Sequence, residues 1–280
     1  MFKVIKTDSN SKARRGTFSC AHGDVATPAF FPVATQAAVK GLSPKELDEI
    51  GVSGLLMNAY HIFLRPGTEV VEKCGGLHKF MNFSRPIITD SGGYQIFSLE
   101  GLRKVSDKGV EFQSHIDGKK FFLTPEEVIK IQLALQPDVL VPLDECVKNP
   151  ASFKVAEKAV KRTIHWAKRS KDYFASNNGA GLRFFGIIQG SVYPELREYC
   201  LKEIEALSPD GLCVGGLSVG EAPQLRYNML SLISERAAPR YLRYFMGYGR
   251  PQDIIEAVEN IIRIGIREIV LDQTAGPVRK

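Results

Sequence analysis

Little in this 280-residue sequence marks a secreted, membrane or zinc-finger protein. Its five cysteines are scattered and form no CxxC pair, which argues against a disulfide framework and a local zinc knuckle. No apolar stretch is long enough to span a bilayer, and residues 1–6 contain no apolar signal core. The sequence therefore predicts a cytoplasmic protein that does not enter a membrane.

Several catalytic motifs are absent as well. There is no GxGxxG or Walker loop to hold nucleotide phosphates, and no Ser-His-Asp or Cys-His set. No lysine ends a predicted strand, which argues against a Schiff-base, aldolase-type barrel. None of the five histidines lies at a predicted strand end; they are His22, His61, His78, His115 and His165.

The composition is that of a globular protein with a large core and a basic surface. Hydrophobic residues make up 44% and charged residues 24%, and 37 Lys and Arg stand against 31 Asp and Glu. The basic residues cluster in residues 12–15, 154–171 and 236–250. Such clusters favour RNA or another polyanion as partner, although a solvated surface has the same composition.

Short apolar runs alternate with helical patterns along the chain. Strands are predicted at residues 30–33, 54–58, 86–90, 139–144, 184–189, 212–216, 244–247 and 268–272. Helices are predicted at residues 43–50, 125–135, 156–176, 194–207 and 251–264. Continuous apolar runs indicate a parallel sheet covered on both faces, and eight strands close a (β/α)8 TIM barrel. We predict one such domain over residues 1–280, with an open doubly wound sheet as the alternative.

A Gly-rich segment with alternating polarity, residues 99–122, interrupts this pattern after the third strand. It predicts an inserted hairpin that lies over the mouth of the barrel.

The strand ends carry the chemistry, because the C-terminal ends of all strands in such a barrel face one mouth. The residues there are Asn58, Asp90, Asp144, Gln189, Gly215, Gly216, Met246, Gly247 and Asp272. The segment Thr89-Asp90-Ser91-Gly92-Gly93-Tyr94-Gln95 is the most informative, because two glycines after a carboxylate let backbone amides approach a ligand. A turn in which Asp90 caps the next helix is the alternative.

These side chains match the hydrogen-bonding edge of guanine. One carboxylate, Asp144, can accept both the ring N1–H and the exocyclic amine, and Gln189 or the Gly216 amide can donate to O6. Tyr94 and Met246 can cover the two faces of the base. The sequence therefore predicts a guanine-binding pocket with Asp90 available for chemistry at the sugar.

Motifs spread from about Ala13 to Val258 resemble those of the bacterial tRNA-guanine transglycosylases, also called queuine tRNA-ribosyltransferases. Besides the segment around Asp90, they are His22-Gly23, Thr27-Pro28-Ala29-Phe30, Asn58-Ala59-Tyr60-His61, Leu64-Arg65-Pro66-Gly67, Gly75-Gly76-Leu77-His78-Lys79-Phe80, Leu123-Thr124-Pro125-Glu126, Leu143-Asp144-Glu145-Cys146, Gly186-Ile187-Ile188-Gln189-Gly190, Gly215-Gly216-Leu217-Ser218-Val219-Gly220-Glu221 and Met246-Gly247-Tyr248-Gly249. The resemblance implies a (β/α)8 barrel that replaces guanine at the anticodon wobble position of tRNA with a queuosine precursor, 7-aminomethyl-7-deazaguanine in bacteria.

The resemblance also implies roles for individual residues. Asp90 corresponds to the general acid/base of a double displacement through a covalent Asp–ribose intermediate, and Cys146 and Val219 correspond to the bacterial form of the pocket. The implied substrate-binding residues are Ser91, Gly92, Gly93, Tyr94, Asp144, Cys146, Gln189, Gly216, Leu217 and Met246. The implied RNA-binding residues are Gly247, Tyr248, Gly249, Arg250, Pro251, Gln252 and Asp253. The implied partners are tRNA and guanine or the deazaguanine, and a homodimer remains an open expectation.

The chain departs from the family pattern near its end. The family nucleophile lies in a Phe-Asp-(Cys/Ser)-x-x-Pro-Thr-Arg segment, and an ungapped register places Ile266 at that Asp. Asp272 ends the eighth predicted strand and is the candidate replacement. The family's CxCxxC zinc site and its later His are not found, so no cofactor is predicted and the zinc subdomain is expected to be missing. A homologue that binds the base or tRNA without turnover, or serves as a non-catalytic partner of an active subunit, is the second hypothesis.

Overall fold

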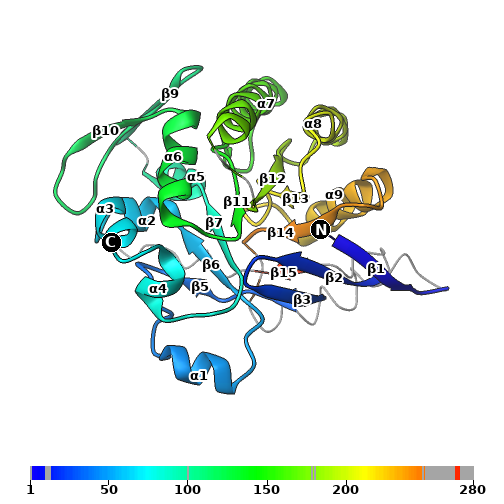
Figure 1. Cartoon of the computed structure of the whole chain (residues 1–280). Coiled ribbons are helices and arrows are strands. Elements are labelled where there is room, and N and C mark those ends of the chain that lie inside the picture. The colour runs from blue at the N-terminus through cyan, green and yellow to red at the C-terminus, as the bar shows by residue number, and fades with distance from the viewer. Residues whose placement is uncertain are drawn as a thin grey trace.

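The structure, a computed structural model, describes residues 2–9, 14–99, 101–177, 179, 181–247, 249 and 269–271. Residues 269–271 are described by their backbone only. Its central feature is a curled parallel sheet in an α/β fold (Figure 1). The strands, in spatial order, are β4 (Ala29–Phe30), β15 (Ile269–Leu271), β14 (Leu242–Phe245), β13 (Gly211–Val214), β12 (Arg183–Ile188), β11 (Val139–Leu140), β7 (Ile87–Asp90), β6 (Leu55–Asn58) and β5 (Val33–Ala34).

The two end strands of this sheet, β4 and β5, are neighbours in the chain. Only Phe31 and Pro32 separate them, yet β4 pairs with β15 and β5 pairs with β6, both in parallel. The first predicted strand, residues 30–33, is therefore present as two short pieces, which pair with strands at opposite ends of the sheet. Proline at position 32 has no amide hydrogen to donate at the junction.

Four longer helices cover one part of the sheet, as Figure 1 shows: α6 (Pro125–Leu135), α7 (Phe153–Ser176), α8 (Pro194–Glu205) and α9 (Pro223–Arg236). Each packs against the next in chain order. α6 begins where predicted, because Thr124 and Glu127 form a capping box before Pro125. α7 begins three residues before its predicted start, and the predicted helix at residues 251–264 lies outside the described residues.

Five shorter helices follow the first strands: α1 (Pro44–Glu49), α2 (Ala59–Leu64), α3 (Thr68–Lys73), α4 (Leu77–Met81) and α5 (Gly93–Ser98). Only α1 was predicted. The others, like α1, have no more than six residues, too short for a helical period to show in the sequence, and they lack the capping box and proline that mark the start of α1. None of the helices in the described part of the chain has the length and hydropathy that crossing a bilayer requires.

Alternate residues of the strands point into two different cores. In β12, Phe185 and Ile187 pack inside the sheet with Leu56 and Tyr244, whereas Ile188 packs against α7, α8 and α9. This period of two is the reason why almost every strand residue is apolar.

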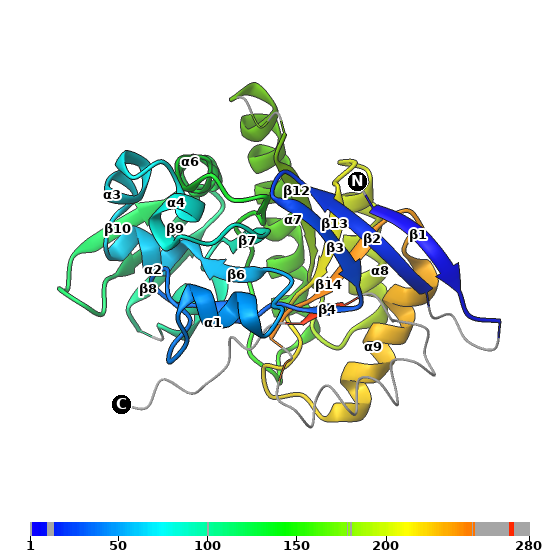
Figure 2. The same ribbon diagram turned by 60° about the horizontal axis from the view of Figure 1, so that its bottom comes forward.

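An antiparallel sheet that the sequence did not reveal precedes the parallel one: β1 (Phe2–Thr7), β2 (Arg14–Cys20) and β3 (Gly23–Thr27) (Figure 2). Phe18 and Val25 from it complete the inner core. Arg14, predicted to belong to a basic cluster, is buried and donates to the carbonyl oxygens of Pro239 and Tyr241.

An insertion after the third strand is present as predicted, but it is a three-stranded antiparallel sheet and not a two-stranded hairpin: β8 (Arg103–Ser106), β9 (Gly109–Gln113) and β10 (Lys120–Leu123). It packs on Tyr60, Ile96 and Trp166, and β9 and β10 lie beyond α6 in Figure 1. The hydroxyl of Tyr60 lies 2.9 Å from Nδ1 of His115 in the loop between β9 and β10.

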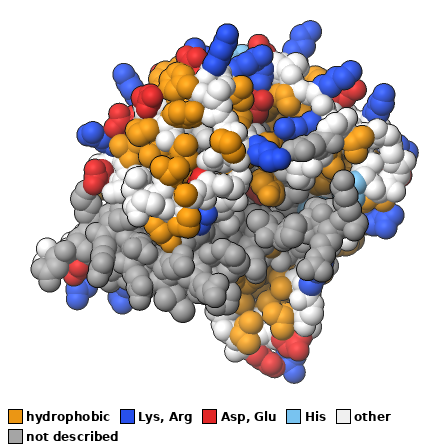
Figure 3. Space-filling view, turned by 180° about the vertical axis from the view of Figure 1, so that it is seen from behind, with side chains coloured by type: hydrophobic (Ala, Val, Ile, Leu, Met, Phe, Trp, Pro, Cys, Tyr) orange, Lys and Arg blue, Asp and Glu red, His pale blue; other side chains and the backbone are white. Residues whose placement is uncertain are grey.

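The basic stretch of residues 154–171 is α7, and part of its charge is used within the protein. Arg169 binds both carboxylate oxygens of Glu126 at 2.7 Å, and Arg162 binds Glu145 and Asp107. Lys154 and Lys158 are exposed near the start of the helix. Figure 3 shows Lys and Arg side chains spread around the molecule seen from behind, most of them in its upper half.

Candidate active site

A pocket lies where β7, β11, β12, β13 and β14 end, as the strand-end argument predicted. Its lining residues are Asp90, Ser91, Gly93, Tyr94, Gln95, Asp144, Cys146, Ile187, Gln189, Gly215, Gly216, Leu217, Ser218, Val219, Met246 and Gly247. Nine of the ten predicted substrate-binding residues therefore line one pocket, and the tenth, Gly92, lies behind it against Tyr60.

Asp90 is the last residue of β7 and is 6% exposed. Its Oδ1 accepts the Gly92 amide at 3.0 Å, and the Ser91 hydroxyl accepts the Gly93 amide at 3.2 Å. α5 begins at Gly93 without a side-chain cap, so Asp90 shapes the turn and does not cap the helix. Gly92 has a φ of 79°, and a Cβ there would lie 2.3 Å from Cβ of Tyr60. This position therefore requires glycine.

Asp144 and Gln189 form a buried pair in the pocket. Nε2 of Gln189 donates to Oδ2 of Asp144 at 2.6 Å, and both side chains are at most 9% exposed. Burial raises the pKa of Asp144 to about 6, against the effect of the hydrogen bond from Gln189, which lowers it. Oε1 of Gln189 is buried with no hydrogen-bond partner among the described residues. The pair thus holds hydrogen-bonding capacity that a ligand can use.

Glycine at two positions leaves room around this pair. A Cβ on Gly93 would lie 2.4 Å from Oδ1 of Asp144, and one on Gly216 would lie 2.0 Å from Oε1 of Gln189. Gly216 also has a φ of 62°. Neither position admits a side chain without displacing the carboxylate or the amide.

Arg197 of α8 fixes the backbone below the pocket and was not predicted. Its guanidinium is fully buried and donates to the carbonyl oxygens of Gly215 at 2.7 Å and Gly216 at 3.1 Å. It also donates to those of Ile188 at 3.0 Å and Ser191 at 2.9 Å, and so joins the ends of β12 and β13. Burial lowers its pKa to about 10, so it remains charged at neutral pH. The signal in the sequence was an arginine on the apolar face of a helix.

Glu221 fixes the loop that follows. Its carboxylate accepts the amides of Ser218 at 2.6 Å and Val219 at 2.9 Å, and Nε of Arg226 donates to it at 2.6 Å. The loop carries Leu217 and Val219, both in the pocket wall.

The remaining wall is less polar. Tyr94 from α5 and Met246 after β14 are half-buried, and Leu217 and Cys146 are buried. Burial raises the pKa of the Cys146 thiol, and Asp144 raises it further, so the thiol is protonated at neutral pH. Cys146 therefore contributes a neutral thiol to the pocket wall.

The chain is similar to proteins of one known family. A family model described as Queuine tRNA-ribosyltransferase matches residues 8–261. The Queuine tRNA-ribosyltransferases of Thermoanaerobacter sp. (strain X514) and of Caldanaerobacter subterraneus subsp. tengcongensis are each 47% identical over 257 residues, which cover 92% of this chain and 68% of each relative. That of Aquifex aeolicus is 46% identical over 269 residues, with 92% and 70% covered. The chain belongs to the queuine tRNA-ribosyltransferase family.

Two groups of predicted residues in this queuine tRNA-ribosyltransferase family member are placed only in part. Of the RNA-binding set, Gly247 lines the pocket and Gly249 is buried. Tyr248, Arg250, Pro251, Gln252 and Asp253 lie outside the described residues, as does the predicted nucleophile Asp272. Asp272 follows β15 in the sequence, and β15 pairs with β14 and β4.

Proposed function

We propose that the protein is a tRNA-guanine transglycosylase, a pentosyltransferase that exchanges guanine at the anticodon wobble position for 7-aminomethyl-7-deazaguanine. The observation that carries this proposal is the buried Asp144–Gln189 pair beside Gly216, with Asp90 in the same wall. Family membership supports the same reaction class.

The base would enter by replacing the hydrogen bond between Gln189 and Asp144. The N1–H and the exocyclic amine of guanine take the place of the Gln189 amide at the Asp144 carboxylate. Nε2 of Gln189 is then available to donate to O6, beside the Gly216 amide. Tyr94 and Met246 cover the faces of the ring. Because Asp144 must be ionised to accept two donors, its ionisation controls affinity.

The exchange proceeds by double displacement. A carboxylate attacks C1′ of the ribose as the bond from C1′ to N9 of guanine breaks, and Asp90 donates a proton to the leaving base. The deazaguanine then gives its N9 proton to Asp90 and attacks C1′, which releases the carboxylate. The target nucleotide must leave its stack to reach the pocket. We assign the attacking carboxylate to Asp272, since Ile266 occupies the family position.

A second function has one observation in its favour. The Phe-Asp segment of the family is not recognisable, so a protein that binds guanine or tRNA without turnover would fit the same pocket.

We further propose that the fold is a single closed (β/α)8 barrel, because β4 and β5 act as one strand that joins both ends of the sheet.

Two assays on the same preparation test the proposal. Radiolabelled guanine exchange into unmodified tRNA with the queuosine anticodon measures turnover, and a guanine titration measures the pocket. We expect the wild type to show both guanine exchange and guanine binding. Asp272→Ala should lose exchange. Asp144→Ala should lose binding, because two donors of the base are left unpaired. Binding without exchange supports the second function, and unchanged affinity in Asp144→Ala refutes the pocket assignment.

The RNA part of the proposal has its own test. If Lys154, Lys158 and other exposed basic residues hold phosphates, the affinity for tRNA falls steeply as salt rises, while guanine affinity stays nearly constant. A flat response for tRNA contradicts the electrostatic contribution.

A further inference from the structure

A second convergent group of side chains lies at the opposite end of the parallel sheet, where β7 and β11 begin. Asp138 directly precedes β11, His22 lies in the turn between β2 and β3, and His78 belongs to α4. One ligand atom of each residue lies within 4.8 Å of those of the other two. Within the described ranges, no other three His, Cys, Asp or Glu side chains converge in this way.

The carboxylate of Asp138 is at the centre of this group. Nδ1 of His22 lies 3.1 Å from its Oδ1, and Nε2 of His78 lies 3.1 Å from its Oδ2. The backbone amides of His22 and Ile87 each donate to it at 2.9 Å, which fixes its orientation. Burial alone would raise the pKa of Asp138, but these hydrogen bonds outweigh it and lower the pKa to about 2. The carboxylate is therefore ionised at neutral pH.

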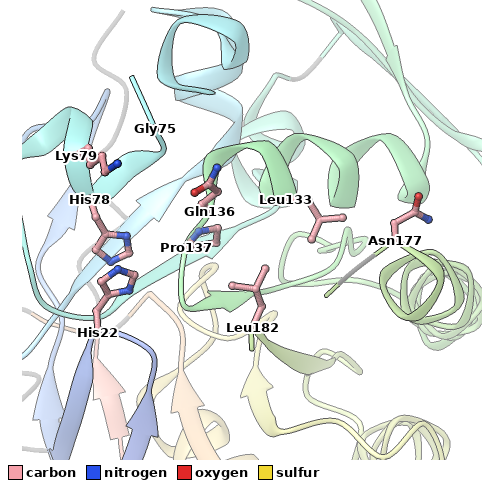
Figure 4. A pocket seen from close by; sticks show the side chains of 9 residues that line it. All are labelled: His22, Gly75, His78, Lys79, Leu133, Gln136, Pro137, Asn177 and Leu182. Carbon is pink, nitrogen blue, oxygen red and sulfur yellow. The ribbon is translucent and has the colours of Figure 1, made fainter. Parts of the chain in front are cut away.

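The two imidazole rings stack on one another. Their centroids are 3.5 Å apart and their planes differ by 13°, and Figure 4 shows them one above the other. Both rings line a pocket of about 530 Å³, which also has Lys79, Gln136 and Asn177 in its wall. An ion thus has a path to the ring nitrogens, and the pocket leaves space for water as further ligands.

We propose that His22, His78 and Asp138 form a binding site for a divalent transition-metal ion such as Zn²⁺ or Ni²⁺. Two imidazole nitrogens and one carboxylate oxygen are a ligand set that these ions prefer over Mg²⁺ or Ca²⁺. The site differs in ligands and position from the cysteine-rich zinc site of the family, and it does not depend on the proposed transferase activity.

The geometry requires one small rearrangement. Bonds of about 2.1 Å to one ion bring ligand atoms within about 4.2 Å of each other, and parallel rings cannot both direct their in-plane lone pairs at the same point. His22 can tilt, because its side chain is 40% exposed, whereas that of Asp138 is fully buried. The ion takes the place of the hydrogens between the imidazoles and Asp138, and each neutral ring that binds the ion carries its hydrogen on the other ring nitrogen.

A bound ion would connect three segments distant in sequence: the antiparallel sheet β1–β3, helix α4 and the start of β11. Because an ion that binds the folded state raises its apparent stability, the melting temperature should rise with metal concentration.

The test uses the 280-residue chain carrying Cys74→Ser, which removes an exposed thiol beside Gly75 of the pocket. Titration with Ni²⁺ by calorimetry, and with Co²⁺ by visible absorption, should show one saturable site and a higher melting temperature. His22→Gln and His78→Gln should each weaken binding by more than ~10-fold, since loss of an outer-shell partner alone costs about that much.

His165→Gln is the matched control, because His165 is an exposed histidine on α7. It should bind Ni²⁺ and Co²⁺ as the parent does. Absence of saturable binding, or equal binding by parent, His22→Gln and His78→Gln, overturns the proposal and leaves a hydrogen-bonded clasp. If His78→Gln does not fold, the half-exposed His22→Gln decides the question alone.

Discussion

The two ends of the parallel sheet each hold a buried aspartate, and their surroundings give these carboxylates opposite properties. At the start of the strands, Asp138 accepts two backbone amides and contacts two imidazoles, and its pKa falls to about 2. At the end of the strands, Asp144 is buried with Gln189 as its side-chain partner, and its pKa rises to about 6. The hydrogen bonds to Asp138 stabilise the fold at the start of the strands. At their end, Oε1 of Gln189 has no hydrogen-bond partner among the described residues and is available to a ligand.

The largest expected effect concerns the pocket end alone. Asp90→Asn should reduce guanine exchange by about 100-fold or more, because the leaving base loses its proton donor. Guanine affinity and the free energy of unfolding should change little, since the amide can still accept the Gly92 amide hydrogen. Exchange kinetics and a guanine titration on the same protein separate the two quantities. Exchange at the normal rate would exclude Asp90 as the acid/base.

The opposite end should respond in stability and not in guanine binding. Asp138→Ala should lower the free energy of unfolding by about 3 kcal/mol, because the buried amides of His22 and Ile87 lose their acceptor. The pKa of Asp138 is lowered from 3.8, so its ionisation stabilises the fold above pH ~4 by about 2 kcal/mol. That contribution is lost as the pH falls toward about 2.

Urea unfolding at pH 7, and in steps down to pH 3, measures both effects. Asp24→Asn, a change at an exposed acid in β3, is the control and should be nearly neutral. An Asp138→Ala protein as stable as the wild type would remove the distinction between the two ends.

The pH dependence of base binding tests Asp144. Its folded pKa is raised from 3.8 to about 6, so the carboxyl is mostly protonated at pH 5 and ionised at pH 7. Guanine affinity should therefore fall about tenfold from pH 7 to pH 5, in proportion to the ionised fraction. The same raised pKa makes stability decrease as the pH rises from about 4 to about 6, opposite in sign to Asp138. Asp144→Asn should lose both dependences, and a pH-independent wild-type affinity would contradict the assignment.

The smallest expected effect sharpens the account of the pocket end. Arg197→Lys keeps the charge but cannot reach four carbonyl oxygens, so the peptide between Gly215 and Gly216 is held less firmly. We expect guanine affinity to fall about fivefold, roughly 1 kcal/mol, with a raised KM and a nearly unchanged kcat. Arg236→Lys on the exposed side of α9 is the control. A fall in kcat alone would place Arg197 in the chemistry instead.

The sequence was sufficient to predict the strands of the parallel sheet and the residues that follow their C-terminal ends. Apolar runs such as those of β7 and β12 are long and bounded, so Asp90 and Gln189 could be placed at the pocket before any coordinates. The antiparallel sheet β1–β3 was missed, because Lys, Arg and Gly interrupt the apolar residues of its short strands. Its pattern has meaning only once Phe18 and Val25 are seen in the inner core.

Contacts between residues far apart in the sequence could not be predicted either. Arg197 and the group of His22, His78 and Asp138 depend on positions that no local pattern relates. The position of Arg197 on the apolar face of α8 marks it as unusual, but its role is seen only once its four carbonyl partners are known. Charge counts misled for the same reason, since Arg14, Arg162 and Arg169 serve internal contacts.

The division of one strand into β4 and β5 has a consequence for synthesis of the chain. Ala29 pairs with Val270, so β4 finds this neighbour only after synthesis has reached residue 270. Until then β4 has an unpaired edge, which is a site for wrong association with another chain. Contacts at such sequence separation also slow folding. The nascent protein therefore has a long interval in which a chaperone that covers this edge would raise the yield of native molecules.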